Sequence, residues 1–351
     1  MSVLVVGAHG VAGGAAAAHL SSMGRPVTTL GRRPVEPAPG DPAAIRSHLQ
    51  ADLLDPDSLP PESLSGITAV VYAGYAERAG FAETTELNER MLAGLLHALE
   101  RDGAAPERFV LIGGDKSYGE HLGPYRTPAK ESDPRLLGPI LYNPQEDLVQ
   151  GAAARFGWSW TVLRPDGIFG HSIGSPMNIL TGIAAFATLS KEEGVPLRYP
   201  GSLAGWGALH QATDARILAR AVGWALDAET ARDEVFNVTN GDTFRWKHLW
   251  TDIAEFFDLP VGEPQPLDLA GQMRGQSARW RRLAERDGLR ITELDDFVRW
   301  PFVQGWLDTG YDMVQSTVKI RIAGFGDAID SHESLRDHLL QLRRHRFIPA
   351  N

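Results

Sequence analysis

The chain has 351 residues, of which 43% are hydrophobic, and a formal net charge of −10. This length allows two domains, or one large α/β domain with a smaller addition. The charge excludes a broad basic surface for nucleic acid or an anionic membrane, and the lack of cysteine excludes disulfides, iron–sulfur clusters and thiolate zinc sites. With no signal-peptide pattern and no apolar run long enough to span a bilayer, we expect a cytoplasmic protein.

Short strand-like runs alternate with helical stretches over the first part of the chain. The runs "SVLVVGA", "PVTTL", "AVVYAG" and "RFVLIGG" are rich in Val, Ile and Leu, as strands buried on both faces of a parallel sheet are. Between them, "ETTELNERMLAGLLHALERDG" has apolar residues at helical spacing. A further strand, "SWTVL", ends at Arg164–Pro165, and "EVFNVTN" follows later. The pattern predicts an α/β fold with a Rossmann-type, doubly wound parallel sheet.

The pattern becomes helical and rich in tryptophan from about Gly170. We therefore expect an NADP(H)-binding Rossmann domain over residues 1–170, with its sheet completed by segments around residues 196–240. A smaller, mostly helical substrate-binding part over residues 171–351 would be interleaved with it.

Three glycines stand between the first strand and the first helix, in "VVGAHGVAGGAAAAHL". Gly7, Gly10 and Gly13 have the spacing GxxGxxG, with His9 and Val11 inside the motif. Small residues there allow a tight turn and the close approach of a pyrophosphate, which then lies at the positive end of the helix. An ordinary tight turn is the alternative, but the place between a strand and a helix favours the nucleotide.

The second strand ends in "TLGRRP", with arginine where NAD-binding folds usually carry Asp or Glu. Arg32 and Arg33 can neutralise a 2′-phosphate, so we expect NADP(H), although two arginines in a loop are often merely solvated. Asp52–Leu53, at the end of the third strand, are candidate contacts to the adenine. Ala73–Gly74, in "YAGYA" after the fourth strand, are candidates for the lining of the cofactor cleft.

A competing motif is "GHSIG", Gly170 to Gly174, which fits the G-x-S-x-G pattern of a serine-hydrolase elbow. That elbow needs a strand, a sharp turn and a helix in immediate succession. Here Pro165 and Gly167 come between the strand and the motif, and Pro176 follows it, so the hydrolase is the weaker interpretation. The histidines have no metal-ligand spacing, so no metal site is predicted.

A tyrosine and a lysine are the candidate acid–base residues. Tyr142 stands at the start of a predicted helix, in "GPILYNPQEDLVQ", but the fourth residue after it is Glu146 and not the lysine of typical short-chain dehydrogenases. A phenol, with a pKa of roughly 10, is a useful proton donor near neutral pH only if its pKa is lowered or a cation stabilises its anion. Lys116, in "LIGGDKSYGEHLGPY", leaves the carboxyl end of the fifth strand, where such folds hold their ligands. It can supply that charge, although a lone lysine in a loop is more often solvated.

Several motifs along the chain match one known family. The strongest match is "FNVTNGDTFRWKHLW", and the others include "GAHGVAG" with "GRRP", "PAKESDPRL", "YNPQED", "LRPDGIFG" and "YPGSLAGW". With these motifs the whole chain resembles the progesterone 5β-reductase/iridoid synthase (PRISE) family of atypical short-chain dehydrogenases. The resemblance implies that Tyr142 and Lys116 are the catalytic pair and that the missing lysine is a family trait. The cofactor contacts that it implies are Gly7, Gly10, Val11, Arg32, Arg33 and Asp52, with Pro165 and Ile168 beside the nicotinamide.

The resemblance also implies an NADPH-dependent reductase. Family members typically reduce a C=C bond conjugated to a carbonyl, so we expect hydride transfer to the β-carbon of an enone or enal, with Tyr142 stabilising the enolate. Carbonyl reduction by the same residues is one alternative. A non-catalytic NADP(H)-binding sensor or scaffold is another, which an intact Tyr–Lys pair disfavours. The expected substrate is a small hydrophobic carbonyl compound, and a homodimer stays open. Candidate pocket residues are Tyr125, Met177, Trp206 and Trp246.

The chain departs from the family's pattern around this pocket. Asn143 replaces the second tyrosine, Tyr125 replaces a phenylalanine and His9 replaces a threonine. A short extension also lies between Lys116 and "LGP". These changes put the substrate and the reaction in question, but not the cofactor.

Overall fold

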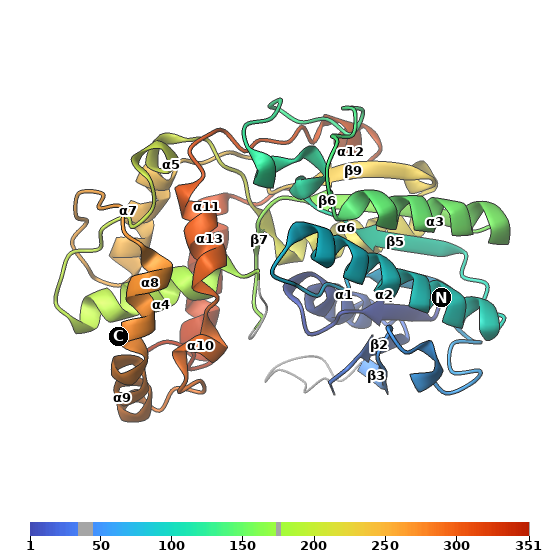
Figure 1. The fold of residues 1–351 in the computed structure, drawn as a ribbon, viewed down its shortest axis with the longest axis horizontal. Coiled ribbons are helices and arrows are strands. Elements are labelled where there is room, and N and C mark those ends of the chain that lie inside the picture. Colours follow the sequence, from blue (N-terminus) through green and yellow to red (C-terminus); the bar gives the residue numbers. More distant parts are fainter. Residues whose placement is uncertain (34–44, 173–176, 351) are drawn as a thin grey trace. The chain divides into compact units, whose positions relative to one another are not determined.

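The computed structural model describes residues 1–33, 45–172 and 177–350, and the chain divides into two compact units. One of them, here the sheet unit, consists of Met1–Asp166, Ala215–Thr239 and Gln315–Asp327. The other, the helical unit, consists of Gly167–Asp214, Asn240–Val314 and Ala328–Asn351. Each unit is therefore built from segments that lie far apart in the sequence (Figure 1).

A seven-stranded sheet forms the centre of the sheet unit, and every neighbouring pair of its strands is parallel. The strand order reverses between β1 and β4, and doubly wound folds bind nucleotides outside the carboxyl ends of the strands at such a point. The predicted fold class is confirmed. In spatial order the strands are β3 (Ile45–Gln50), β2 (Val27–Gly31), β1 (Val3–Val6), β4 (Ala69–Tyr72), β5 (Arg108–Ile112), β6 (Ser159–Pro165) and β9 (Glu234–Val238).

Helices cover both faces of this sheet, in the pairs α1 (Val11–Ser22) with α6 (Ala215–Asp227) and α2 (Phe81–Arg101) with α3 (Tyr142–Phe156). Leu4 and Val6 of β1 belong to the core that α2 and α3 complete. Val3 and Val5 alternate with them along the strand and are fully buried on the opposite face. Burial on both faces explains why the strands read as continuous apolar runs.

Short elements follow several strand and helix ends of the sheet unit. They are the 3₁₀ turns η1 (Pro56–Ser58), η2 (Asp115–Tyr118), η3 (Glu120–Leu122) and η4 (Glu229–Ala231), and the helix α12 (Val318–Ile322).

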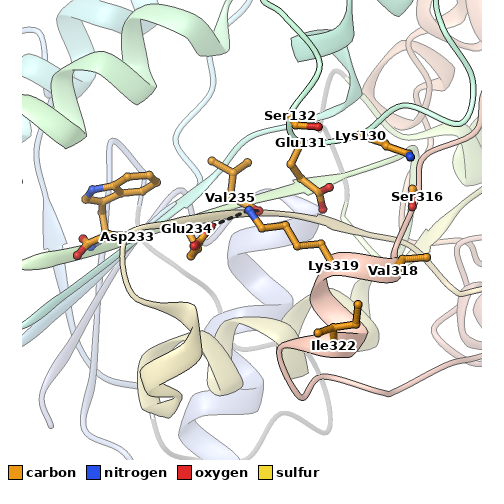
Figure 2. A pocket seen from close by; sticks show the side chains of 11 residues that line it. Lys130, Glu131, Ser132, Asp233, Glu234, Val235, Ser316, Val318, Lys319 and Ile322 are labelled. Carbon is orange, nitrogen blue, oxygen red and sulfur yellow. Dashed lines mark hydrogen bonds and ion pairs between the residues drawn. The ribbon is translucent and has the colours of Figure 1, made fainter.

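Side chains of neighbouring segments cover the edge of β9 that faces away from β6 (Figure 2). Lys319 of α12 donates from Nζ to the carbonyl oxygen of Val235 at 2.9 Å and pairs with Glu234 at 2.6 Å. Glu131 accepts the backbone N–H of Asn237 at 2.9 Å. Glu131, Val235 and Lys319 are among the residues that line a groove of about 540 Å³. Backbone groups that are already bonded make this edge a poor template for pairing with another chain.

The helical unit contains a two-stranded parallel sheet, β7 (Ile168–Phe169) with β8 (Thr213–Asp214). Its core is aromatic: the ring centroid of Trp246 lies 5.7 Å from that of Trp306 and 5.3 Å from that of Phe244. In the described part of the chain, no helix is long and apolar enough to cross a membrane. The helical elements of this unit are α4 (Ile179–Glu192), α5 (Leu203–Gly207), α7 (Trp246–Phe256), α8 (Leu269–Met273), η5 (Arg274–Gln276), α9 (Ser277–Asp287), α10 (Leu294–Phe297), α11 (Trp300–Asp308) and α13 (Ser331–Arg344).

Candidate active site

The glycine turn lies at the point where the strand order reverses, between β1 and β4. Gly7 has a φ of 82°, and a Cβ atom there would lie 2.4 Å from the carbonyl oxygen of Ala73. A Cβ at Gly13 would lie 2.4 Å from the carbonyl oxygen of Gly7. Gly7 is therefore required for its backbone conformation, and both glycines are required for the close packing of β1, β4 and α1.

The N-terminus of α1 follows this turn directly. Gly10 is the N-cap residue, and no side chain caps the helix. The first N–H groups of a helix have no intrahelical acceptor, and the helix dipole makes this end positive. A crowded glycine turn at an uncapped helix N-terminus fits the pyrophosphate of a dinucleotide.

The carboxyl end of β2 presents two exposed arginine side chains, Arg32 and Arg33. Gln50 of β3 donates from Nε2 to the carbonyl oxygen of Arg32 at 3.1 Å, which fixes the backbone there. The arrangement can hold a phosphate next to the glycine turn.

The end of β3 offers less for a ligand than the sequence suggested. Oδ1 of Asp52 accepts the backbone N–H of Leu54 at 3.0 Å, so one oxygen of that carboxylate already bonds the backbone of its own turn. Leu53 is 4% exposed and belongs to the core of the sheet unit. Their contacts with an adenine stay a prediction.

Two histidines stand beside the arginines. The ring centroid of His9, in the glycine turn, lies 6.1 Å from that of His48 on β3, edge to face. Burial, and then the charge of His9, lowers the pKa of His48. The sequence indicated a role only for His9, because the pairing of β2 with β3 is what brings His48 to the same place.

Side chains of α2 fix the loop that follows β4 and contains Ala73 and Gly74. Oδ1 of Asn88 accepts the N–H of Ala76 at 2.9 Å, and its Nδ2 donates to the carbonyl oxygen of Ala76 at 2.6 Å. Oγ1 of Thr84 accepts the N–H of Arg78 at 3.0 Å. The loop beside Gly7 is therefore anchored by partly buried hydrogen bonds, which the strand pattern alone did not predict.

Tyr142 is the first residue of α3, as predicted, and its phenol lies against the carboxyl end of β5. A Cβ at Gly114 would lie 2.7 Å from Oη of Tyr142, so the glycine leaves the space that the phenol fills. Lys116 follows Gly114 within η2. The structure thus brings Tyr142 and the segment that carries Lys116 to one edge of the sheet.

Acidic groups surround the phenol. Burial, followed by the electrostatic effects of Asp115, Tyr75 and Glu120, raises the pKa of Tyr142 above its ordinary value. Burial also raises the pKa of both carboxyls, whereas the charge of Lys116 lowers it. The phenol is therefore a protonated hydrogen-bond donor at neutral pH, and Lys116 acts on the carboxyls beside it.

Glu120 and His121 are further candidate site residues, which the sequence did not predict. They belong to the extension between Lys116 and Leu122. Burial and the charge of Asp115 raise the pKa of Glu120 to about 8. Burial, and then the charge of Lys116, lowers the pKa of His121 to about 4, and its ring packs edge-on against Phe81 at 4.9 Å. Charged residues in a loop read as solvated, so the extension itself was the only signal for them.

Glu146, the residue in place of the missing lysine, is the partner of a buried arginine. Its Oε1 accepts from Nε of Arg164 at 3.1 Å and from Nη2 at 2.8 Å, and its Oε2 accepts from Nη2 at 3.0 Å. Glu146 is 2% exposed and Arg164 is 6% exposed. This position therefore joins α3 to β6.

The other predicted residues divide between the two units. In the sheet unit, Pro165 ends β6 and Tyr125 is half-buried. In the helical unit, the ring centroids of Trp206 and Trp246 lie 5.0 Å and 6.3 Å from that of Tyr199, and Trp246 has no exposed surface. Their role in a pocket stays a prediction. The predicted residues in the helical unit are Ile168 in β7, Met177 before α4, Trp206 in α5 and Trp246 in α7.

The competing "GHSIG" motif lies partly outside the described residues, because Ile173 and Gly174 are not among them. Ser172 is 6% exposed, and Nδ2 of Asn178 donates to its carbonyl oxygen at 3.0 Å. Among residues 1–33, 45–172 and 177–350, no group of three or more histidines and acidic residues is placed to hold a metal ion.

Comparison with known proteins finds relatives that cover most of the chain. A family model described as a PRISE-like Rossmann-fold domain matches residues 58–327. An (S)-8-oxocitronellyl enol synthase from Camptotheca acuminata is 31% identical over 99% of this chain and 93% of its own length. Another enzyme of that name, from Nepeta cataria, is 32% identical over 87% of this chain and 84% of its own length.

Solved structures of more distant proteins have the same fold. A UDP-glucose 4-epimerase from Thermotoga maritima, with UDP-glucose, superimposes with a TM-score of 0.68 at 17% identity, over 98% of this chain and 99% of its own. A short-chain dehydrogenase/reductase superfamily protein from Agrobacterium tumefaciens, with bound NAD, gives 0.67 at 17% identity, over 99% and 98%. At such identities the likeness extends to the fold alone.

Proposed function

Because the chain belongs to the PRISE-like Rossmann-fold family, we propose that it is an NADPH-dependent reductase of a C=C bond conjugated to a carbonyl, in an enal or enone. The observation that carries this proposal is the phenol of Tyr142 at the carboxyl edge of the sheet, where burial and neighbouring acids keep it protonated. A protonated phenol donates a hydrogen bond to the carbonyl oxygen, and this bond strengthens as negative charge develops on the enolate. The name of the relatives, enol synthase, fits a reaction that forms an enolate.

The glycine turn and the end of β2 would hold the cofactor. Gly7, Gly10 and Gly13 leave room for a pyrophosphate at the N-terminus of α1. Arg32 and Arg33 would pair with the 2′-phosphate of NADP(H). The bound cofactor supplies the hydride that reaches the β-carbon of the substrate.

Tyr142 and Lys116 act together on the enolate that forms in this reaction, by different interactions. Tyr142 holds the carbonyl oxygen through its proton. Lys116 offsets the negative charge of Asp115, which would otherwise repel the enolate that forms nearby. Reduction of a carbonyl would use the same residues, but Tyr142 would then have to transfer its proton to the alkoxide.

The proposal is tested by NADPH consumption against small enals, cyclic enones, steroid enones and simple ketones, with identification of each product. We expect turnover of one or more conjugated compounds to the saturated carbonyl or its enol. Products that are all alcohols would identify a carbonyl reductase. Tight binding of NADPH with no turnover of any compound would identify a sensor and contradict the proposal.

A further inference from the structure

A buried polar network joins the segment that carries Tyr142 to the segment that carries Lys116. Glu146 lies one helical turn after Tyr142, on the same face of α3, and is held by three hydrogen bonds from Arg164. The guanidinium carbon of Arg164 lies 5.1 Å from the ring centroid of Tyr118. Tyr118 is the last residue of η2, the turn that contains Lys116.

The network continues from Tyr118 into the last strand of the sheet. Oη of Tyr118 donates to Oδ1 of Asn237, on β9, at 2.5 Å. Nδ2 of Asn237 donates to the carbonyl oxygens of Ala129 at 3.2 Å and Ser316 at 3.1 Å. Glu146, Arg164, Tyr118 and Asn237 are 2%, 6%, 7% and 0% exposed. Each member therefore takes its position from protein contacts and not from water.

Local structure does not fix either segment by itself. The start of α3 has no side-chain cap at Leu141 and no acidic residue in its first turn. The turn η2 is short and lies between Gly114 and Gly119, and glycine restricts the backbone least of all residues. The places of the phenol and of the lysine therefore depend on tertiary contacts.

We propose that Glu146, Arg164, Tyr118 and Asn237 are positioning residues, which hold Tyr142 and Lys116 in the relative geometry that the reaction requires. This inference rests on the proposed function, because it takes Tyr142 and Lys116 as the catalytic pair. A buried ion pair contributes little net stability, since the cost of desolvation offsets most of the attraction. A displacement of about 1 Å at a reacting group, in contrast, costs about 10²-fold in rate.

The mildest test is Tyr118→Phe, which deletes the hydroxyl bonded to Asn237 and keeps the ring. We expect kcat to fall about tenfold while KM and the dissociation constant of NADPH stay close to those of the wild type, because the glycine turn and Arg32 are untouched. An unchanged kcat would overturn the role of Tyr118 and Asn237.

The sharper test is Arg164→Lys, which keeps the charge but cannot bond both oxygens of Glu146 in the same way. The matched control is Arg108→Lys, since Arg108 is also a buried strand arginine. It is 5% exposed, bonds Ser159 at 3.1 Å and Glu229 at 2.8 Å, and lies at the opposite, amino end of β5. We expect both variants to lower the melting temperature, but only Arg164→Lys to lower kcat. Equal kcat values in the two variants would overturn the inference.

A double-variant cycle separates positioning from general damage to the fold. If Arg164 acts through the phenol, Arg164→Lys should lower kcat in the wild type but hardly at all in the Tyr142→Phe background. The same fold-loss in both backgrounds would overturn the inference while leaving the proposed function intact. Full activity of Tyr142→Phe alone would instead refute the proposed function, and with it the pair to be positioned.

Discussion

The two ends of the candidate site, at β1–β4 and at β5–β6, are formed by different parts of the chain: the backbone at the first and side chains at the second. At β1–β4 the backbone makes the site: Gly7 and Gly13 let two strands and a helix approach so closely that a Cβ atom would lie 2.4 Å from a carbonyl oxygen. At β5–β6 buried side chains make it, through the bonds of Glu146 to Arg164 and the charges around Tyr142. The first kind of site tolerates no added atom, whereas the second is sensitive to charge and hydrogen bonding.

The difference predicts how each end responds to substitution. A change in the backbone turn should remove cofactor binding and folding together, because one set of atoms serves both. A change among the buried polar side chains should lower kcat more than it weakens cofactor binding.

The largest effect is expected for Gly7→Ala. Its Cβ would collide with the carbonyl group of Ala73 in addition to straining a positive φ, so we expect loss of NADPH binding and of most of the stability. The control is Gly24→Ala, which has a φ of 76° but no atom within 4 Å of the new Cβ, and so carries only the conformational strain. Fluorescence titration and thermal melts measure both variants. Similar behaviour of the two would show that crowding at the turn is unimportant.

The next effect is expected for Tyr142→Phe. If a ketone is the substrate, kcat should fall about 10²–10⁴-fold, since the alkoxide needs a positioned acid. If an enal or enone is the substrate the loss should be smaller, because the enolate can take its proton from water. Lys116→Ala should add little to Tyr142→Phe if the two residues act together. Steady-state kinetics of the single and double variants provide the measurement, and full activity of both single variants would contradict the pairing.

A smaller effect is expected for Arg32→Ala and Arg33→Ala, which lie at the backbone end but act through side chains. Charge-assisted hydrogen bonds to a phosphate contribute about 1.5–3 kcal/mol each, so each variant should weaken NADPH binding about tenfold or more. Binding of NADH, which lacks that phosphate, should hardly change. Titration with both nucleotides measures this, and an equal loss for both would argue against a 2′-phosphate site.

The smallest effect is expected for Glu120→Gln, and it depends on pH. The pKa of Glu120 is raised from 4.5 to about 8 in the folded chain. Between these values the unfolded chain releases a proton that the folded chain keeps, so this carboxyl lowers the free energy of unfolding as the pH rises. Near pH 4 the carboxyl is protonated in both states and has no such effect.

The variant should therefore raise the melting temperature at pH 8 by about 2 °C or more, and leave it nearly unchanged at pH 4. Glu100→Gln, at an exposed position on α2, is the control, for which no such difference between pH 4 and pH 8 is expected. Thermal melts at the two pH values provide the measurement. The same gain at both pH values would mean that the neutral side chain simply packs better.

Sequence reasoning was sufficient where burial or steric crowding determines the residue. The fold class, the family and the assignment as an oxidoreductase are confirmed. Strands such as Val3–Val6 were predictable from the sequence because burial on both faces leaves a continuous apolar run. The start of α3 at Tyr142 was predictable because a loop containing Gly138 and Pro139 precedes a helical pattern.

Sequence reasoning was insufficient where a partner decides the role of a charged residue. No role was predicted for Arg164, and none for Glu146 beyond standing in place of a lysine, since nothing in their own surroundings shows that two distant segments bring them together in the core. Glu120 was overlooked for the same reason. Trp246 was assigned to a pocket by its motif, whereas its ring packs in the aromatic core of the helical unit. Its contact with a substrate stays a prediction.

The covered edge of β9 has a consequence for how the chain folds while it is being synthesised. Lys319, which bonds the carbonyl oxygen of Val235, comes 84 residues after it, and Ser316, which bonds Asn237, is almost as distant. While the ribosome synthesises the stretch between, β9 has neither partner, and an open strand edge on an unfinished sheet is prone to pair with other chains. We therefore expect β9 to need protection by chaperones until α12 has been synthesised and can cover this edge.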